Sequence, residues 1–110
     1  MGLYNDDIGV AVDNSEYRYV KSNFERLQEG LQEKKDVGAI ITLLANTMES
    51  LETAAEKYPI LLKKDKDFKK MWSDSVNIGK RIEKDAKKDS TTKEQLDAYG
   101  SKITRFLKAA

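Results

Sequence analysis

The residues that most often carry chemistry in proteins are His and Cys, and this sequence contains neither. Without His it lacks the commonest general base and the commonest metal ligand. Without Cys it lacks a thiolate nucleophile, disulfides and the usual ligands of iron–sulfur clusters. Two patterns of other reactive side chains remain, the carboxylates Glu49, Glu52 and Glu56 and the stretch Ser90-Thr91-Thr92-Lys93.

These two patterns do not predict an active site. A di-iron or di-manganese bundle needs Glu-x-x-His on two helices, and the three glutamates fall largely outside the apolar stripe of their segment. Ser90 and Lys93 have the spacing of a Ser-x-x-Lys pair, but they lie in a polar turn, where helix capping accounts for them. There is no glycine-rich phosphate loop. We therefore expect no enzyme and no catalytic, cofactor-binding or metal-binding residue.

A basic segment is the clearest charged feature. Between residues 68 and 88 seven Lys and Arg side chains stand against three Asp and Glu. The acidic residues interrupt the cations, and no aromatic side chain is expected to be exposed among them, so nucleic acid and a membrane surface are both disfavoured. Two interpretations stay open, an ordinary solvated helix face and a contact surface for another protein. The cations are Lys69, Lys70, Lys80, Arg81, Lys84, Lys87 and Lys88.

Length and composition favour one small helical domain. The chain has 110 residues, of which 39% are apolar and 35% charged, with one Pro. Residues 1–58 carry six Lys and Arg against eleven Asp and Glu, whereas residues 59–110 carry fourteen against eight. This asymmetry can help the two halves pair, or it can make one face acidic and another basic.

The segment 37–58 holds the longest apolar-periodic run and is expected to be the central helix. Its apolar residues recur at spacings of three and four, and Asp36 is placed to cap it. A first helix over 16–34 precedes it after a connection of about two residues, which favours antiparallel neighbours. The stripe of the first helix is Tyr17, Val20, Phe24, Leu27 and Leu31.

Pro59 ends the central helix, and Ile60-Leu61-Leu62 then folds back over the end of the bundle. A third helix over 68–88 follows, with Asp65 or Asp67 as its cap. Thr91-Thr92-Lys93-Glu94 matches a capping box and begins a fourth helix over 92–108. The aromatic side chains Tyr17, Tyr58, Trp72 and Tyr99 are all expected to pack in the core.

The predicted fold is all-α, an antiparallel up-down-up-down four-helix bundle over residues 15–110 with an irregular N-terminal arm over 1–14. Its helices are expected at about 16–34, 37–58, 68–88 and 92–108. In the arm the larger apolar residues Ile8, Val10 and Val12 alternate along the chain, as in a short extended segment.

The layout of residues 16–110 resembles the cytochrome b562 and cytochrome c′ type of four-helix bundle. The matching features are a first helix with Phe24 and Leu27, a second ending in AAEKYP, a third opening FKKMW and a short fourth helix. The resemblance implies the fold alone, because the family's haem ligands are absent. Its Cys-x-x-Cys-His motif has no counterpart in YGSKITRFLKAA, and Phe24 stands where a Met ligand would be expected.

The function that fits these features is a small non-enzymatic protein-binding module, of the inhibitor, immunity, adaptor or phage- or plasmid-type modulator class. The partner is another protein, and the chain is a monomer or a small homo-oligomer. An alternative is a carrier of a small apolar ligand in the core near Met48, Trp72, Ser75 and Gly79; another is a haem-free relative of the b562-type cytochromes. The expected partner-binding residues are Lys69, Lys80, Arg81, Lys84, Lys87, Ile60, Leu61 and Leu62.

The sequence also bears on location. No uncharged run is long enough to span a bilayer, and the start MGLYNDDIGVAV lacks the basic n-region and long apolar region of a secretory signal. These features favour a cytoplasmic protein, or a periplasmic or secreted one from which a signal has been removed.

Overall fold

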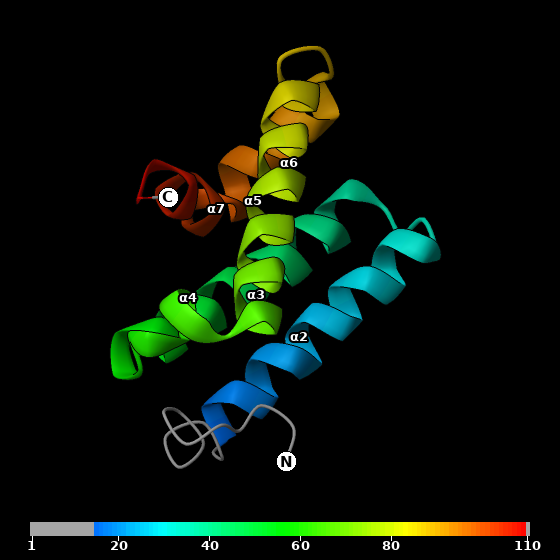
Figure 1. Ribbon diagram of the computed structural model, residues 1–110. Helices are drawn as coiled ribbons and strands as arrows, with labels where there is room; N and C mark the ends of the chain where they lie inside the picture. Colours follow the sequence, from blue (N-terminus) through cyan, green and yellow to red (C-terminus); the bar gives the residue numbers. More distant parts are fainter. Residues whose placement is uncertain (1–14, 110) are drawn as a thin grey trace.

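The computed structural model describes residues 15–109, and within them the fold is all-α, with six helices and no strand. The predicted all-α class is confirmed, whereas the predicted N-terminal arm lies outside the described residues. The helices are α2 (Ser15–Gln32), α3 (Val37–Lys57), α4 (Ile60–Lys64), α5 (Lys66–Ala86), α6 (Ser90–Tyr99) and α7 (Ser101–Ala109) (Figure 1). None of these helices is long and apolar enough to cross a membrane.

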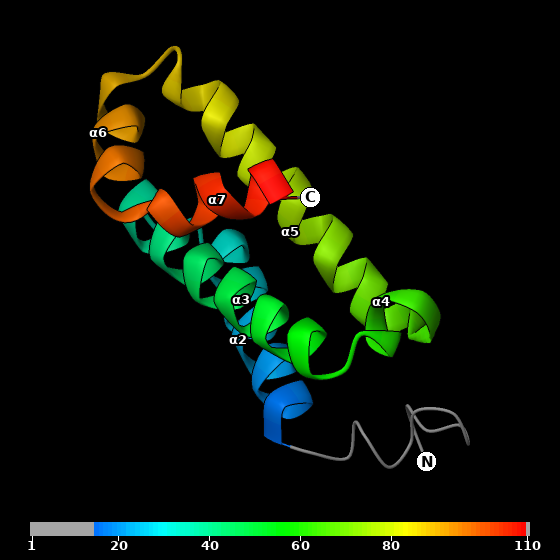
Figure 2. The same ribbon diagram turned by 90° about the vertical axis from the view of Figure 1, so that its left-hand side faces the viewer.

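Helix α3 is the centre of the molecule, and α2, α4, α5, α6 and α7 all pack against it (Figures 1 and 2). The apolar period predicted this, and Ile41, Leu44, Met48 and Leu51 are fully buried. Asp36 caps the helix as expected, because its Oδ1 accepts a hydrogen bond of 2.9 Å from the backbone N–H of Ala39.

Helices α2 and α3 form an antiparallel hairpin, and α2 ends two residues earlier than predicted. Lys34 adopts a left-handed backbone with φ of 55°. Its N–H donates to the carbonyl of Leu31, and the N–H of Lys35 donates to the carbonyl of Gly30, at 3.2 and 3.0 Å. This pair of bonds is the Schellman motif that ends many helices, with a lysine where glycine is usual.

The segment after Pro59 is a short helix, α4, that closes the end of the molecule between α3 and α5 (Figure 2). Asp65 follows it and starts α5 at Lys66, two residues earlier than expected. Its carboxylate accepts from the Phe68 N–H at 2.9 Å and from the Tyr17 hydroxyl at 3.3 Å. One buried aspartate therefore caps α5 and ties it to α2.

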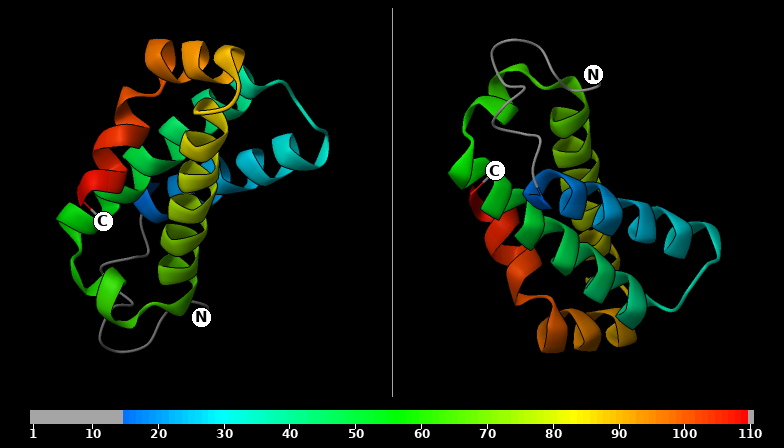
Figure 3. Two further views of the ribbon diagram at one scale, coloured as in Figure 1. Left: turned by 90° about the horizontal axis from the view of Figure 1, so that it is seen from above. Right: turned by 90° about the horizontal axis from the view of Figure 1, so that it is seen from below.

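The predicted fourth helix over 92–108 is wrong in one respect, because the structure divides it into α6 and α7. The N–H of Gly100 donates to the carbonyl of Leu96 at 2.7 Å and ends α6, and α7 then runs in a different direction (Figure 3). The change of direction leaves Tyr99 61% exposed, although we expected it in the core. Asp89 caps α6 through the Thr91 N–H, in place of the predicted capping box.

A row of aromatic rings connects α2, α5 and α7 through the core. The ring centroids of Tyr17 and Phe68 lie 6.2 Å apart, those of Phe68 and Trp72 also 6.2 Å, and those of Trp72 and Phe106 4.6 Å. Three of the four rings are buried, whereas Trp72 is half-buried and reaches the surface. The indole is therefore both a core residue and part of an accessible face.

Candidate partner-binding surface

Four of the predicted partner-binding cations form one row along the outside of α5 and its C-cap, which we call the lysine stripe: Lys69, Lys80, Lys84 and the cap residue Lys87. At 3.6 residues per turn they fall within roughly 60° of the helix circumference and extend over about 27 Å. All four side chains are exposed. The opposite side of α5 is buried in the core through residues such as Phe68 and Ile82, so the stripe faces solvent.

Few acidic groups neutralise the stripe. Within residues 15–109, Lys80, Lys84 and Lys87 form no ion pair, and neither does the exposed Arg81 beside them. Lys69 donates only to the backbone carbonyl of Lys63, at 3.4 Å. Lys80, Arg81, Lys84 and Lys87 thus lie together on one accessible surface without ion-pair partners among the described residues, whereas Lys70 of the same segment is paired with Asp74 at 2.9 Å.

The apolar part of the predicted surface needs correction. Leu61 is fully buried, because α4 turns it into the core between α3 and α5, so it cannot contact a partner. Ile60 is half-buried and packs against the same core. Only Leu62 is exposed, at 36%. The sequence indicated that this segment folds over the end of the bundle but could not show which leucine points inward.

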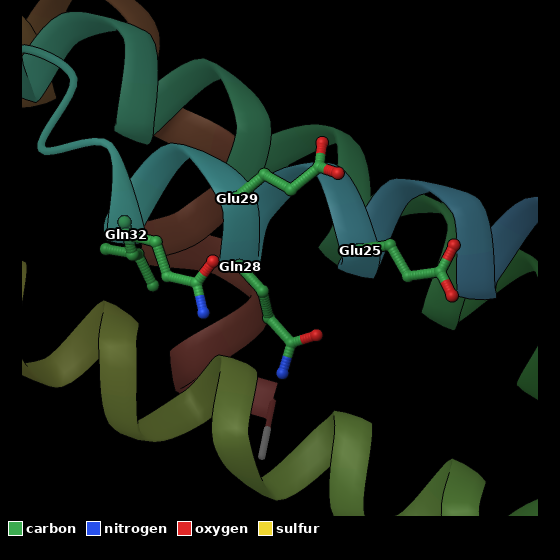
Figure 4. Close-up of a pocket in the computed structure, with 5 residues that line it drawn as sticks. Glu25, Gln28, Glu29 and Gln32 are labelled. Atoms are coloured by element: carbon green, nitrogen blue, oxygen red, sulfur yellow. The ribbon is translucent and has the colours of Figure 1, made fainter.

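A hollow of about 670 Å³ lies along the second half of α2. Its charged lining residues are acidic, in contrast to the basic lysine stripe. Figure 4 shows Gln28 and Gln32 directed toward α5 and Glu29 directed away from it. Leu31, which we expected on the apolar stripe, lines the hollow and is 41% exposed. All its lining residues, Glu25 included, come from one helix, so the feature is an open depression and not an enclosed site.

A second hollow was not predicted. We call it the Trp72 groove, and its volume is about 520 Å³ where α3, α5 and α7 meet. The sequence reasoning assigned Trp72 wholly to the core and gave α7 no functional residue. No local sequence signal marks it, because Ala55, Trp72 and Ala109 come together only where α3, α5 and α7 meet. The groove is lined by Glu52, Ala55, Glu56, Trp72, Lys102, Arg105 and Ala109.

The region proposed for an apolar ligand is closely packed at Gly79. A Cβ added there would lie 3.1 Å from Met48 Cε and 3.2 Å from Leu107 Cδ2. The small residue therefore permits close approach of helices. Ser75 is fully buried and its Oγ has no hydrogen-bond partner within the described part of the chain. The ligand-carrier alternative stays a prediction.

The groups with shifted acidities belong to the scaffold and not to the stripe. Burial and the neighbouring Asp65 raise the pKa of the Tyr17 phenol. The hydrogen bond between Lys57 and Glu16 lowers the pKa of Glu16 and raises that of Lys57. A hydrogen bond from Thr92 lowers the pKa of Asp89 at the cap of α6. These shifts come from contacts between α2 and α3, between Tyr17 and Asp65, and at the N-terminal cap of α6.

The geometry of the described residues contains no group of three or more acidic side chains placed to hold a metal ion. Comparisons of the chain with protein-family models, with curated proteins and with solved structures found no match. The resemblance to the b562-type bundles therefore stays a prediction, and the surface itself carries the functional argument.

Proposed function

We propose that this protein is a small protein-binding module that contacts an acidic surface of its partner through the lysine stripe. The observation that carries the proposal is the row of exposed lysines on one side of a 21-residue helix, unpaired within residues 15–109 apart from one long backbone contact. A helix packed into the core holds these cations in fixed register. A partner therefore meets a preformed positive surface.

Electrostatics gives such a surface a defined role. Complementary charge raises association rates by roughly 10- to 1,000-fold at low salt, and added salt removes the gain because the screening length is only about 8 Å at physiological ionic strength. Charged rims contribute more to rate and specificity than to residence time. The partner's binding should thus weaken steeply with salt, mainly through slower association.

The same proposal places the protein among inhibitors, immunity proteins, adaptors or phage- and plasmid-type modulators that act by covering another protein, as a monomer or a small homo-oligomer. It also treats α6 and α7 together as the fourth member of an antiparallel bundle. The support is that both helices pack against α3 and α5.

The test compares two charge-reversal variants of equal total charge. One carries Lys80→Glu, Arg81→Glu and Lys84→Glu on α5. The matched control carries Arg18→Glu, Lys21→Glu and Arg26→Glu, three exposed cations of α2. Each reversal lowers the net charge by two, so three reversals take the net charge of both variants from +1 to −5. Each is used as bait in lysate of the source organism, and captured proteins are identified by mass spectrometry.

We expect the wild type and the α2 variant to capture the same protein and the α5 variant to lose it, while all three keep equal helicity by circular dichroism. Captured protein should also elute at moderate salt. If the α5 variant captures the partner as well as the wild type does, the stripe is the wrong surface. Equal loss in both triple variants would show an effect of net charge alone.

A further inference from the structure

The Trp72 groove is built by three helices with a clear division of roles. Lys102, Arg105 and Ala109 lie three and four residues apart, so they share one side of α7. Glu52, Ala55 and Glu56 share one side of α3 in the same way, and α5 supplies Trp72 between them. The hollow exists because Ala55 and Ala109 present only methyl groups beside the half-buried indole.

The charges around the groove are of two kinds. Lys102 Nζ lies 2.6 Å from Glu52 Oε1, and both side chains are largely covered, so these charges compensate each other. Arg105 and Glu56 are exposed, and neither forms an ion pair with any residue between 15 and 109. The groove therefore offers an apolar floor, one free guanidinium and one free carboxylate at its rim.

The groove also borders the lysine stripe. Lys69, Trp72, Val76 and Lys80 are successive neighbours on α5, three or four residues apart, and the helical period puts Trp72 roughly 60° from Lys69. Trp72 and Val76 are half-buried, whereas the two lysines are exposed. One partner surface can thus cover the stripe and reach the groove together.

We infer that the Trp72 groove is the anchor pocket of this interface and receives an apolar side chain of the partner with a carboxylate next to it. This inference rests on the proposed function for the acidic character of the partner. The apolar side chain lies on the indole between Ala55 and Ala109, and the guanidinium of Arg105 binds the carboxylate, with the bidentate geometry that arginine favours. Interfaces draw most of their affinity from such desolvated anchors near Trp and Arg, whereas charged rims steer the approach.

The direct test uses a blocked tripeptide, acetyl-Asp-Leu-Asp-amide, titrated into the 110-residue chain while the emission of Trp72, the one Trp of the sequence, is recorded. We expect a saturable change at millimolar peptide. The analogue acetyl-Asn-Leu-Asn-amide should bind at least roughly tenfold more weakly, because it loses the charge-assisted bond to Arg105. The analogue acetyl-Asp-Gly-Asp-amide, without the apolar side chain, should also bind more weakly.

Variants locate the effect. Ala109→Leu fills the groove from the exposed end of α7 and should abolish the response, whereas Ala98→Leu adds the same side chain at an exposed site of α6 and should not. Arg105→Gln should weaken binding of the acidic peptide to the affinity of its neutral analogue. The control Arg26→Gln on α2 should leave binding of the acidic peptide unchanged. Glu56→Gln removes the free negative charge from the rim and should strengthen binding of the acidic peptide.

The outcomes separate this inference from the function on which it rests. If Ala109→Leu binds the peptide and the captured partner like the wild type, the Trp72 groove is not the anchor pocket. This conclusion holds even if the α5 charge reversal still abolishes capture. If the peptide binds the groove but the α5 reversal leaves capture intact, the stripe is wrong and the groove stands. No saturable change in Trp72 emission, or equal affinity for the acidic and neutral peptides, would overturn the inference.

Discussion

Two adjacent leucines in α4 give the sharpest test of how this short helix closes one end of the core. Leu61 is fully buried and Leu62 is 36% exposed, although they differ by one position in the same short helix. Leu61→Ala removes three side-chain carbon atoms from a packed site. Leu62→Ala makes the identical chemical change at the surface, so each variant is the control for the other.

The expected magnitudes differ enough to measure. Truncating a fully buried leucine to alanine costs roughly 2–5 kcal/mol, whereas surface substitutions usually stay within about 0.5 kcal/mol, and a partly exposed leucine lies near the lower value. A domain of this kind has a total stability of about 5–15 kcal/mol. Leu61→Ala therefore removes a large share of it, and Leu62→Ala a small one.

Urea unfolding followed by helical circular dichroism measures both. With a urea slope of about 1–3 kcal/mol per molar, a loss of about 3 kcal/mol lowers the midpoint by roughly 1–3 M. Leu62→Ala should shift it by well under 1 M. Equal losses in the two variants, or a greater loss from Leu62→Ala, would refute the inward orientation of Leu61 and the role of α4 as the closing segment.

The remaining predictions concern helix ends and one buried phenol. Lys34→Gly should stabilise the protein by about 0.5–1 kcal/mol in urea unfolding, because φ is 55° there and glycine adopts that backbone without strain. Gly100→Ala should destabilise it by about 1–3 kcal/mol, because the added Cβ would lie 2.6 Å from the Leu96 carbonyl oxygen. Burial and Asp65 raise the pKa of Tyr17 above its ordinary 10.0, so the native state retains a proton that the unfolded chain releases. The protonated Tyr17 phenol contributes its full stabilisation below about pH 10, and this contribution declines above that pH. In the wild type the free energy of unfolding should therefore fall at alkaline pH by up to about 1.4 kcal/mol per pH unit on account of Tyr17, and Tyr17→Phe should remove this part of the slope.

Each of these has a matched control. Lys35→Gly, one residue beyond the left-handed position, should bring no gain, and a gain equal to that of Lys34→Gly would contradict the Schellman account. Gly38→Ala meets the end of the flexible Gln95 side chain and should cost less than Gly100→Ala. Tyr99→Phe alters an exposed phenol and should leave the alkaline slope unchanged. If it flattens the slope as much as Tyr17→Phe does, burial is not the cause.

Periodicity predicted the elements whose core face is continuous. The run from Val37 gave α3 its bounds to within one residue, and Asp36 was recognisable as its cap because its side chain acts only three residues away. Tyr17 was likewise assigned to the core from its place on a stripe. Such features depend on local spacing, which a sequence shows directly.

The features that the sequence did not reveal depend on contacts between distant segments. Nothing local distinguishes Leu61 from Leu62, because which of them is buried depends on how α4 packs against α3 and α5. A single apolar period runs through Gly100, so the two helices there were read as one. The Trp72 groove requires α3, α5 and α7 to converge, and its lining residues are spread over the chain from Glu52 to Ala109.

The central claim is that partner binding covers the lysine stripe, and lysine footprinting tests it most directly. The captured complex and the free protein are acetylated briefly with acetic anhydride, and the modification of each lysine is quantified by mass spectrometry. We predict strong protection of Lys69, Lys80, Lys84 and Lys87 in the complex and none of Lys21 on α2. Protection of Lys21 with an unchanged stripe would contradict the account.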